Sequence, residues 1–147
     1  MAFDIITYYV ISSKTRKQAK RRSHVNSEIH LKTWNAYQRA WGPIHETERE
    51  ELLRSSVSDN ILYTDPSSQT HGLQELMVRI AQSQQKFTGA YFRNDSFLEH
   101  HDQGLFLWTM YDKDGRAFVK GSSFGRFGTD GRLVQATGFF EAPSNKT

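Results

Sequence analysis

Asp65 is the residue whose type and position best fit acid–base chemistry. It follows the predicted short strand 60–64 and precedes Pro66. A carboxylate that ends a strand at the mouth of an apolar pocket loses hydration, so its pKa rises and it becomes a better proton acceptor near neutral pH. The alternative is structural, because Asp-Pro commonly ends a strand, with the carboxylate capping nearby amides.

A second ionisable cluster is Glu99-His100-His101-Asp102. Histidine transfers protons near neutral pH, and neighbouring residues on a strand point to opposite faces, so at most one histidine enters a pocket. We expect this to be His101 if Asp112 pairs with Arg116 around a three-residue loop, whereas a two- or four-residue loop favours His100. The alternative is a surface histidine at a strand end.

Metal and nucleotide chemistry are not expected. Adjacent histidines on a regular strand cannot both ligate one ion, and no third ligand stands at a recognisable spacing. No glycine-rich phosphate loop joins a strand to a helix. His45 and His71 fall in predicted loops and are expected to be solvated, while Arg126 fits a cross-strand ion pair. We therefore predict no metal and no other cofactor.

Aromatic side chains are spread over the whole chain, and we expect most of them to be buried in the hydrophobic core. The larger ones are Trp34, Tyr37, Trp41, Tyr63, Trp108, Phe124 and Phe127. Most would be core residues in any fold. Several lining one cavity would suit a flat, mostly apolar molecule with a few polar groups.

The last third of the chain, residues 97–141, predicts the sheet that must position these groups. Two turn segments, 112–115 and 128–131, each end in Asp-Gly, the pair that supplies the positive φ of a hairpin. The segments around them are rich in aromatic and branched residues, which favours long strands. In the segment 104–111 both alternating sets of side chains are large and mostly apolar. Helices can cover one face, so the other is expected to be buried in a homodimer or an inner cavity.

The rest of the chain predicts helices at 28–42, 47–55 and 73–85. Asn26 or Ser27 can cap the first, and Thr47 with Glu50 matches a capping box for the second. A short strand is expected at 60–64, a loop at 66–72, and a strand from Ala90 to Leu98. Helices followed by four consecutive antiparallel strands predict an α+β fold, with the helices on one face of a curved sheet.

Composition limits the organisation and the partners. With 147 residues and 37% hydrophobic content, the chain has material for one domain. It has no cysteine and no run of about 18 apolar residues, so we expect a cytoplasmic protein with no membrane partner. Six of its 19 basic residues lie between Lys14 and Arg22, and the chain without residues 1–29 carries 13 basic against 14 acidic residues. We predict a basic, flexible appendage at 1–27, a domain at 28–142 and a tail at 143–147.

The element order, the Tyr63-Thr64-Asp65-Pro66 strand end, the third helix led by Gly72 and the closing segment 121–141 resemble a known family. They are similar to the nuclear transport factor 2-like superfamily, particularly its SnoaL-like branch. The resemblance covers residues 28–141. It implies a cystatin-like α+β barrel, in which the sheet forms a cone with an apolar pocket and the outer sheet face forms a homodimer. Members include polyketide cyclases, ketosteroid isomerase and scytalone dehydratase, and many others only bind.

The same resemblance implies roles for three positions. Asp65 matches the general base of the ketosteroid isomerases, and Tyr37 is the counterpart of their enolate-stabilising tyrosine. The position of their second donor, a protonated acid, falls on Ser123, which cannot serve as a shared-proton acid. This departure argues against steroid-isomerase and SnoaL-type aldol chemistry.

Two functions from different classes follow. The first is a cofactor-free isomerase, cyclase or dehydratase in which Asp65, His101 and Tyr37 move a proton on an apolar carbonyl compound. The second is a non-catalytic module that binds a small molecule or a protein through the same pocket. In both, the expected ligand-binding residues are Trp41, Tyr63, Trp108, Ser123 and Phe127. Nucleic-acid binding by the basic segment is the weakest alternative.

Overall fold

The computed structural model describes residues 5–141, with side chains from residue 13 onward. The predicted tail at 143–147 lies outside the described residues. The elements in chain order are α1 (Ile5–Ala40), α2 (Glu46–Ser56), β1 (Val57–Asp65), β2 (Ser68–His71), α3 (Leu73–Lys86), β3 (Tyr91–His100), β4 (Gln103–Tyr111), β5 (Ala117–Phe127) and β6 (Leu133–Phe140). Within residues 5–141, no helix is both long enough and apolar enough to cross a membrane.

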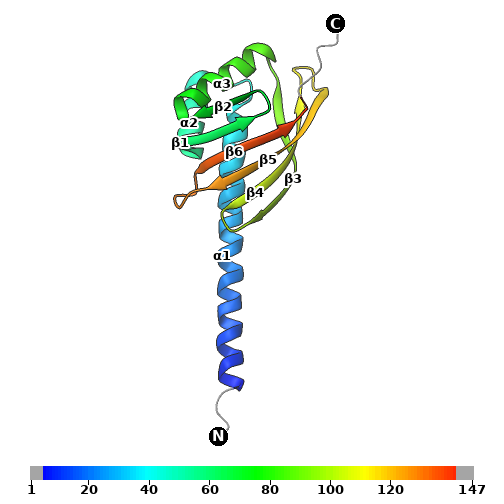
Figure 1. The fold of residues 1–147 in the computed structure, drawn as a ribbon. Coiled ribbons are helices and arrows are strands. Elements are labelled where there is room, and N and C mark those ends of the chain that lie inside the picture. The colour runs from blue at the N-terminus through cyan, green and yellow to red at the C-terminus, as the bar shows by residue number, and fades with distance from the viewer. Residues whose placement is uncertain (1–4, 142–147) are drawn as a thin grey trace.

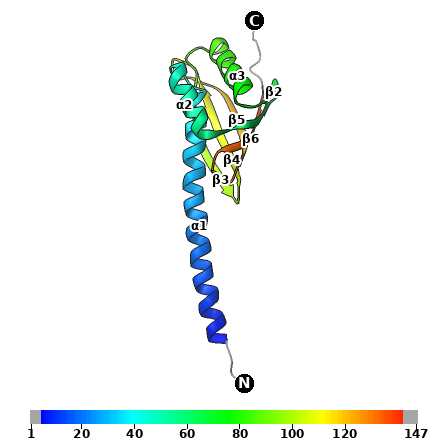
Figure 2. The same ribbon diagram turned by 90° about the vertical axis from the view of Figure 1, so that its left-hand side faces the viewer.

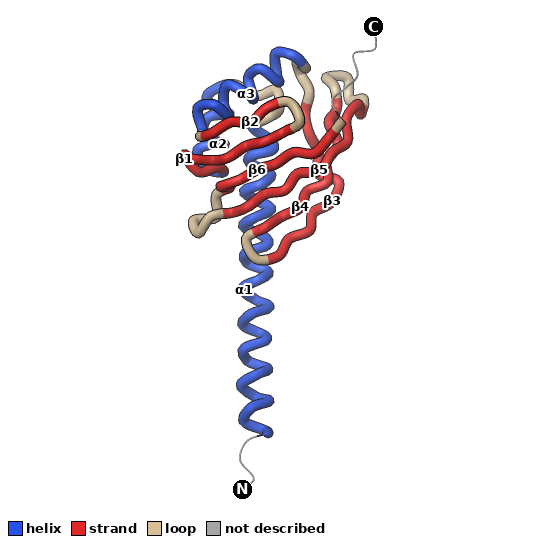
Figure 3. Tube along the Cα trace, viewed as in Figure 1, coloured by secondary structure: helices blue, strands red, loops and turns tan. Residues whose placement is uncertain are grey.

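The strands form one curved sheet that does not close into a barrel. Its order is β2-β1-β6-β5-β4-β3 (Figures 1 and 3). Neighbouring strands are antiparallel except β1 and β6, which are parallel. All three helices lie on one side of the sheet (Figure 2), as the α+β prediction expects.

Strand β4 shows why the sheet needs cover on both faces. Phe106, Trp108 and Met110 are buried on the side of the helices, each 6% exposed or less. Leu105 and Leu107 point the other way and remain 43% exposed. The predicted alternation is therefore confirmed, and the outer face of β4 stays apolar and uncovered in the single chain.

Both predicted hairpins are present. Gly115 and Gly131 each have φ of 81°, the left-handed conformation that the two turns require. The amide of Asp112 donates to the carbonyl of Arg116 at 2.9 Å, which gives the three-residue loop considered from sequence. The long strands thus follow from local turn chemistry.

Helix α1 is longer than predicted. The helix expected at 28–42 is the end of one that begins at Ile5, so neither Asn26 nor Ser27 caps it. From His30 onward it buries Trp34, Tyr37 and Ala40 against the sheet. Residues 13–26 are exposed, and this part of the helix projects away from the body (Figures 1 and 2). Residues 5–27 of the predicted appendage therefore belong to the same continuous helix as residues 28–40.

Two further local predictions were wrong. Helix α2 is capped by His45, whose ring accepts a hydrogen bond from the Thr47 amide at 3.2 Å, so Thr47 does not start a capping box. The predicted loop at 66–72 contains strand β2, because Asp65 and Ser68 pair across a two-residue turn. This hairpin extends the sheet beyond β1.

Candidate ligand-binding site

A cavity of about 370 Å³ lies between the sheet and helices α1 and α3. Its aromatic and aliphatic walls include Trp34, Tyr37, Trp41, Tyr63, Phe87, Phe92, Trp108, Met110, Val119 and Phe140. Its polar lining includes Gln38, Asp65, Ser67, Arg79, Gln82, Ser83, Lys86, Ser123 and Thr137. The volume falls in the usual range for small-molecule sites, and walls that are mainly apolar with some polar groups are typical of such sites.

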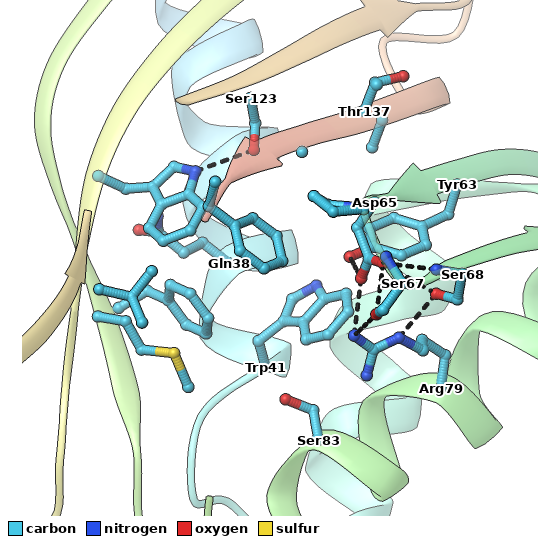
Figure 4. Close-up of a pocket in the computed structure, with 18 of the residues that line it drawn as sticks. Gln38, Trp41, Tyr63, Asp65, Ser67, Ser68, Arg79, Ser83, Ser123 and Thr137 are labelled. Carbon is cyan, nitrogen blue, oxygen red and sulfur yellow. Dashed lines mark hydrogen bonds and ion pairs between the residues drawn. The ribbon is translucent and has the colours of Figure 1, made fainter. Parts of the chain in front are cut away.

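Asp65 is held by a dense network at one side of the cavity (Figure 4). Its Oδ1 accepts hydrogen bonds from the amides and hydroxyls of Ser67 and Ser68 at 2.8–3.2 Å. Its Oδ2 accepts from the Tyr63 hydroxyl and from Arg79 Nη2, both at 2.7 Å. Six hydrogen bonds therefore occupy the lone pairs of this carboxylate.

Arg79 is the main partner of Asp65. The Asp65 side chain is 0% exposed and that of Arg79 is 18% exposed, so the ion pair is largely removed from water. Arg79 Nε also donates to the Ser68 hydroxyl at 2.8 Å, and the guanidinium lies 5.7 Å from the ring centre of Trp41. The pair fixes the β1–β2 turn against helix α3.

The network reverses the pKa predicted for Asp65. Burial by itself raises the pKa, but the hydrogen bonds from Tyr63 and Ser67 and the charge of Arg79 outweigh it. The pKa of Asp65 therefore lies below its ordinary value. A low pKa and fully occupied oxygens do not suit a general base, so the expectation of a raised pKa was wrong.

The other hydroxyls of the cavity are available as donors. Burial is the main cause that raises the pKa of Tyr37 far above its ordinary value, so this phenol keeps its proton. The Ser123 oxygen accepts a hydrogen bond from Trp108 Nε1 at 2.9 Å. Within residues 13–141, no acceptor takes the hydroxyl protons of Tyr37, Ser83 or Ser123. The cavity is therefore rich in donors, and its one carboxylate is already paired.

Comparison with known proteins identifies the fold family. No protein-family model and no curated protein matches the sequence. A solved structure from Agrobacterium tumefaciens, described as a candidate isomerase of the SnoaL-like family, is 27% identical with a TM-score of 0.72, over 78% of this chain and 99% of that one. A nuclear transport factor 2-like protein of unknown function from Exiguobacterium is 18% identical with a TM-score of 0.62, over 74% and 98%. The chain belongs to the nuclear transport factor 2-like, SnoaL-like superfamily.

A further similar solved structure is described as a candidate polyketide cyclase from Sinorhizobium meliloti. It is 11% identical with a TM-score of 0.60, over 73% of this chain and 93% of that one. At this identity the likeness is one of fold alone. The family identity therefore accounts for the cone and its cavity, and the chemistry has to be argued from the residues.

Most sequence-predicted site residues of this SnoaL-like protein do line the cavity. Asp65, Tyr37, Trp41, Tyr63, Trp108 and Ser123 all belong to its lining. The other two predicted residues are elsewhere. His101 is exposed in the turn between β3 and β4, with φ of 55°, and its Nδ1 lies 3.2 Å from that of His100. Phe127 is buried in the core, stacked on His30 at 4.0 Å.

The two corrections have different physical reasons. The three-residue loop between β4 and β5, the condition under which His101 was expected in the pocket, is present, but β3 ends at His100, which pairs with Gln103. His101 is therefore a turn residue without a sheet face. Phe127 lies on the same buried, helix-facing side of β5 as Ser123, but it is four residues further along the strand. There it stacks on His30 of α1 and does not reach the cavity lining.

Arg79 lines the cavity and pairs with Asp65, and the sequence pattern did not predict it as a site residue. It lies one turn from Leu76 and one turn from Ser83 on α3, next to the buried stripe of that helix. From this position on α3, Arg79 can reach the carboxylate of Asp65. Among the described residues, no group of three or more histidine, aspartate or glutamate side chains could hold a metal ion.

Proposed function

We propose that this SnoaL-like protein binds a small, flat, mostly apolar molecule in its cone cavity. The observation that carries the proposal is the cavity itself, about 370 Å³ with aromatic walls. Flat aromatic surfaces favour planar ligands, and burial of apolar area supplies most of the binding free energy.

The polar groups define the complementary chemistry of the ligand. Tyr37, Ser83 and Ser123 offer hydroxyl protons, whereas the carboxylate of Asp65 is saturated by Tyr63, serines and Arg79. A ligand that displaces water from these hydroxyls leaves them unpaired unless it supplies acceptors, and an unpaired buried donor costs free energy. We therefore expect a ligand with carbonyl-type oxygens on an otherwise apolar body. In this proposal Asp65 holds the cavity wall in place and does not contact the ligand as a base.

A cofactor-free isomerase, cyclase or dehydratase is the second candidate. The observation that favours it is the 27% identity to the Agrobacterium candidate isomerase. In this reading Tyr37 donates to a substrate carbonyl, and Asp65 becomes a base only after it loses hydrogen bonds from Ser67, Ser68 or Arg79. That reorganisation weighs against catalysis by Asp65 and leaves binding as the better-supported function.

Ligand binding is tested by native mass spectrometry and titration with polyketide-like, steroid-like and terpenoid carbonyl compounds. We expect at least one compound to bind, and Tyr37→Phe to weaken it about fivefold, the effect of one neutral hydrogen bond. Tyr111→Phe makes the same chemical change outside the cavity lining and is the control. Absence of binding to the wild type, or equal affinities for all three proteins, would contradict the proposal.

The same panel separates the two candidate functions. Asp65→Asn is compared with the wild type for conversion of every compound that binds, after circular dichroism has shown that the variant is folded. Conversion by the wild type alone supports the enzyme and assigns the base to Asp65. Binding without conversion by either protein supports the non-catalytic module.

We also propose a homodimer through the outer sheet face. Leu98 pairs with Leu105 and Leu105 with Phe124 across three neighbouring strands. Leu98 is 70% exposed, and Leu107 and Phe139 on the same sheet are also exposed. A contiguous apolar patch of this kind favours association.

Sedimentation tests the dimer. We expect a dimer at micromolar concentration and a monomer for the double substitution Leu105→Asp and Leu107→Asp, because two buried carboxylates would oppose association. Val78→Asp is the control, since Val78 is 59% exposed on α3, away from the outer sheet face. A monomeric wild type, or a dimer that survives the double substitution, would refute this interface.

A further inference from the structure

The first part of helix α1 is a free-standing basic rod. Residues 13–26 are all exposed, and this stretch extends beyond the sheet in both orthogonal views (Figures 1 and 2). It carries Lys14, Arg16, Lys17, Lys20, Arg21 and Arg22. We call residues 14–22 the basic arm. It takes no part in the cavity or in the outer sheet face.

The charge of the basic arm is not neutralised by any ion pair within residues 13–141. Among residues 13–141, none of its six basic side chains forms an ion pair, and residues 13–27 contain no aspartate or glutamate. The chain without residues 1–29 has 13 basic and 14 acidic residues, so the body is close to neutral. The positive charge of the protein is therefore concentrated on this helix.

The spacing within the basic arm also brings like charges close together on the helix surface. Arg16 with Lys20 and Lys17 with Arg21 are i,i+4 pairs of like charge, which destabilise a helix. An exposed helix without an apolar side gains little from packing. A partner with closely spaced negative charges would remove this repulsion.

We propose that the basic arm binds duplex DNA through its phosphate backbone. Nine helical residues span about 13 Å, so six charges give about one positive charge per 2 Å. Duplex DNA carries about one negative charge per 1.7 Å, and its major groove, about 12 Å wide, admits an α-helix. The charge per unit length of the basic arm is close to that of the DNA, and a helix fits the width of the groove. Because the contacts are to phosphates, we expect binding to be independent of base sequence.

A membrane surface fits the basic arm less well. A helix that lies on a bilayer needs a continuous apolar face. Residues 13–28 contain a single large apolar side chain, Val25, so the basic arm has no such face of its own, and a mostly apolar stretch of α1 precedes it at 5–11. The basic residues also cover most of the circumference of the helix, as contacts to phosphates on two strands require.

The test is fluorescence anisotropy of the full-length protein with a labelled duplex of mixed sequence at several salt concentrations. We expect the logarithm of affinity to fall against the logarithm of salt concentration with a slope of about −5, the value for six phosphate contacts. This corresponds to a loss of about a thousandfold between about 50 and 200 mM salt.

Two variants that each lose three positive charges show whether the salt dependence comes from the basic arm or from the net charge of the protein. Lys14→Gln, Lys17→Gln and Arg21→Gln together are expected to reduce the slope by about 3. Lys113→Gln, Arg116→Gln and Lys120→Gln remove three charges from exposed body positions and are expected to leave it unchanged. Equal effects of the two variants, or no salt-dependent binding by the wild type, would overturn the proposal. So would binding to phosphatidylserine vesicles in the absence of duplex binding.

Discussion

Asp65→Ala is expected to lower the free energy of unfolding by about 3–5 kcal/mol, the usual cost of removing one partner from a buried ion pair. The substitution leaves the Arg79 guanidinium, only 18% exposed, without its carboxylate. It also removes the acceptor of the Tyr63 hydroxyl and of the Ser67 and Ser68 amides. Because these groups join β1, β2 and α3, the cavity wall is expected to loosen with them.

Urea denaturation measures this effect, with Asp59→Ala as the control. Asp59 lies on the same strand but is exposed, so its substitution is expected to change stability by about 0.5 kcal/mol or less. Adding Arg79→Met to Asp65→Ala should recover part of the loss, since no buried charge then remains unpaired. Equal effects of Asp65→Ala and Asp59→Ala would show that the network does not stabilise the fold.

The same ion pair predicts a pH dependence. The pKa of Asp65 is lower in the folded protein than its ordinary value, so the unfolded state binds more protons at acidic pH. The stabilisation is present in full above about pH 4, the ordinary range of an aspartate, and is lost as the pH falls through the folded pKa. The stability difference between wild type and Asp65→Ala should therefore shrink below about pH 4. A constant difference down to pH 2 would contradict this assignment.

Phe106→Ala is expected to cost about 3–5 kcal/mol of stability, as for other buried phenylalanines. Phe106 is 0% exposed and lies between two stacked rings, Trp34 at 3.8 Å and Phe97 at 4.7 Å. These contacts join helix α1 to strands β3 and β4. The cavity left by the substitution could not be filled without moving one of these elements.

Phe118→Ala makes the same chemical change on strand β5 and serves as the control. Phe118 is 38% exposed, so its removal should cost about 1 kcal/mol or less. Both variants are compared by chemical denaturation at the same protein concentration. If Phe118→Ala were as damaging as Phe106→Ala, the helix-facing side of the sheet would not be the main core.

Most of the sheet could be predicted because its signals are local. Asp-Gly pairs at 114–115 and 130–131 require a positive φ and so fix two hairpins, and the alternation of β4 assigns Phe106 and Leu105 to opposite faces. Both depend on residues within a few positions of one another. The start of α1 was missed because its first half has no amphipathic pattern, and β2 because four residues between turn signals carry little pattern.

The sequence by itself determined the α+β class, the superfamily and the cavity position of Asp65, Tyr37, Trp108 and Ser123. Tertiary structure alone decided what Asp65 does. Arg79 is 14 residues away, and its charge reaches the carboxylate only because α3 packs over the β1–β2 turn. A pKa depends on every charge and hydrogen bond around the group, and strand faces depend on each bulge between two positions. The pKa of a residue and the sheet face of a strand residue both depend on contacts between residues distant in the chain. They are therefore decided only when folding brings these residues together.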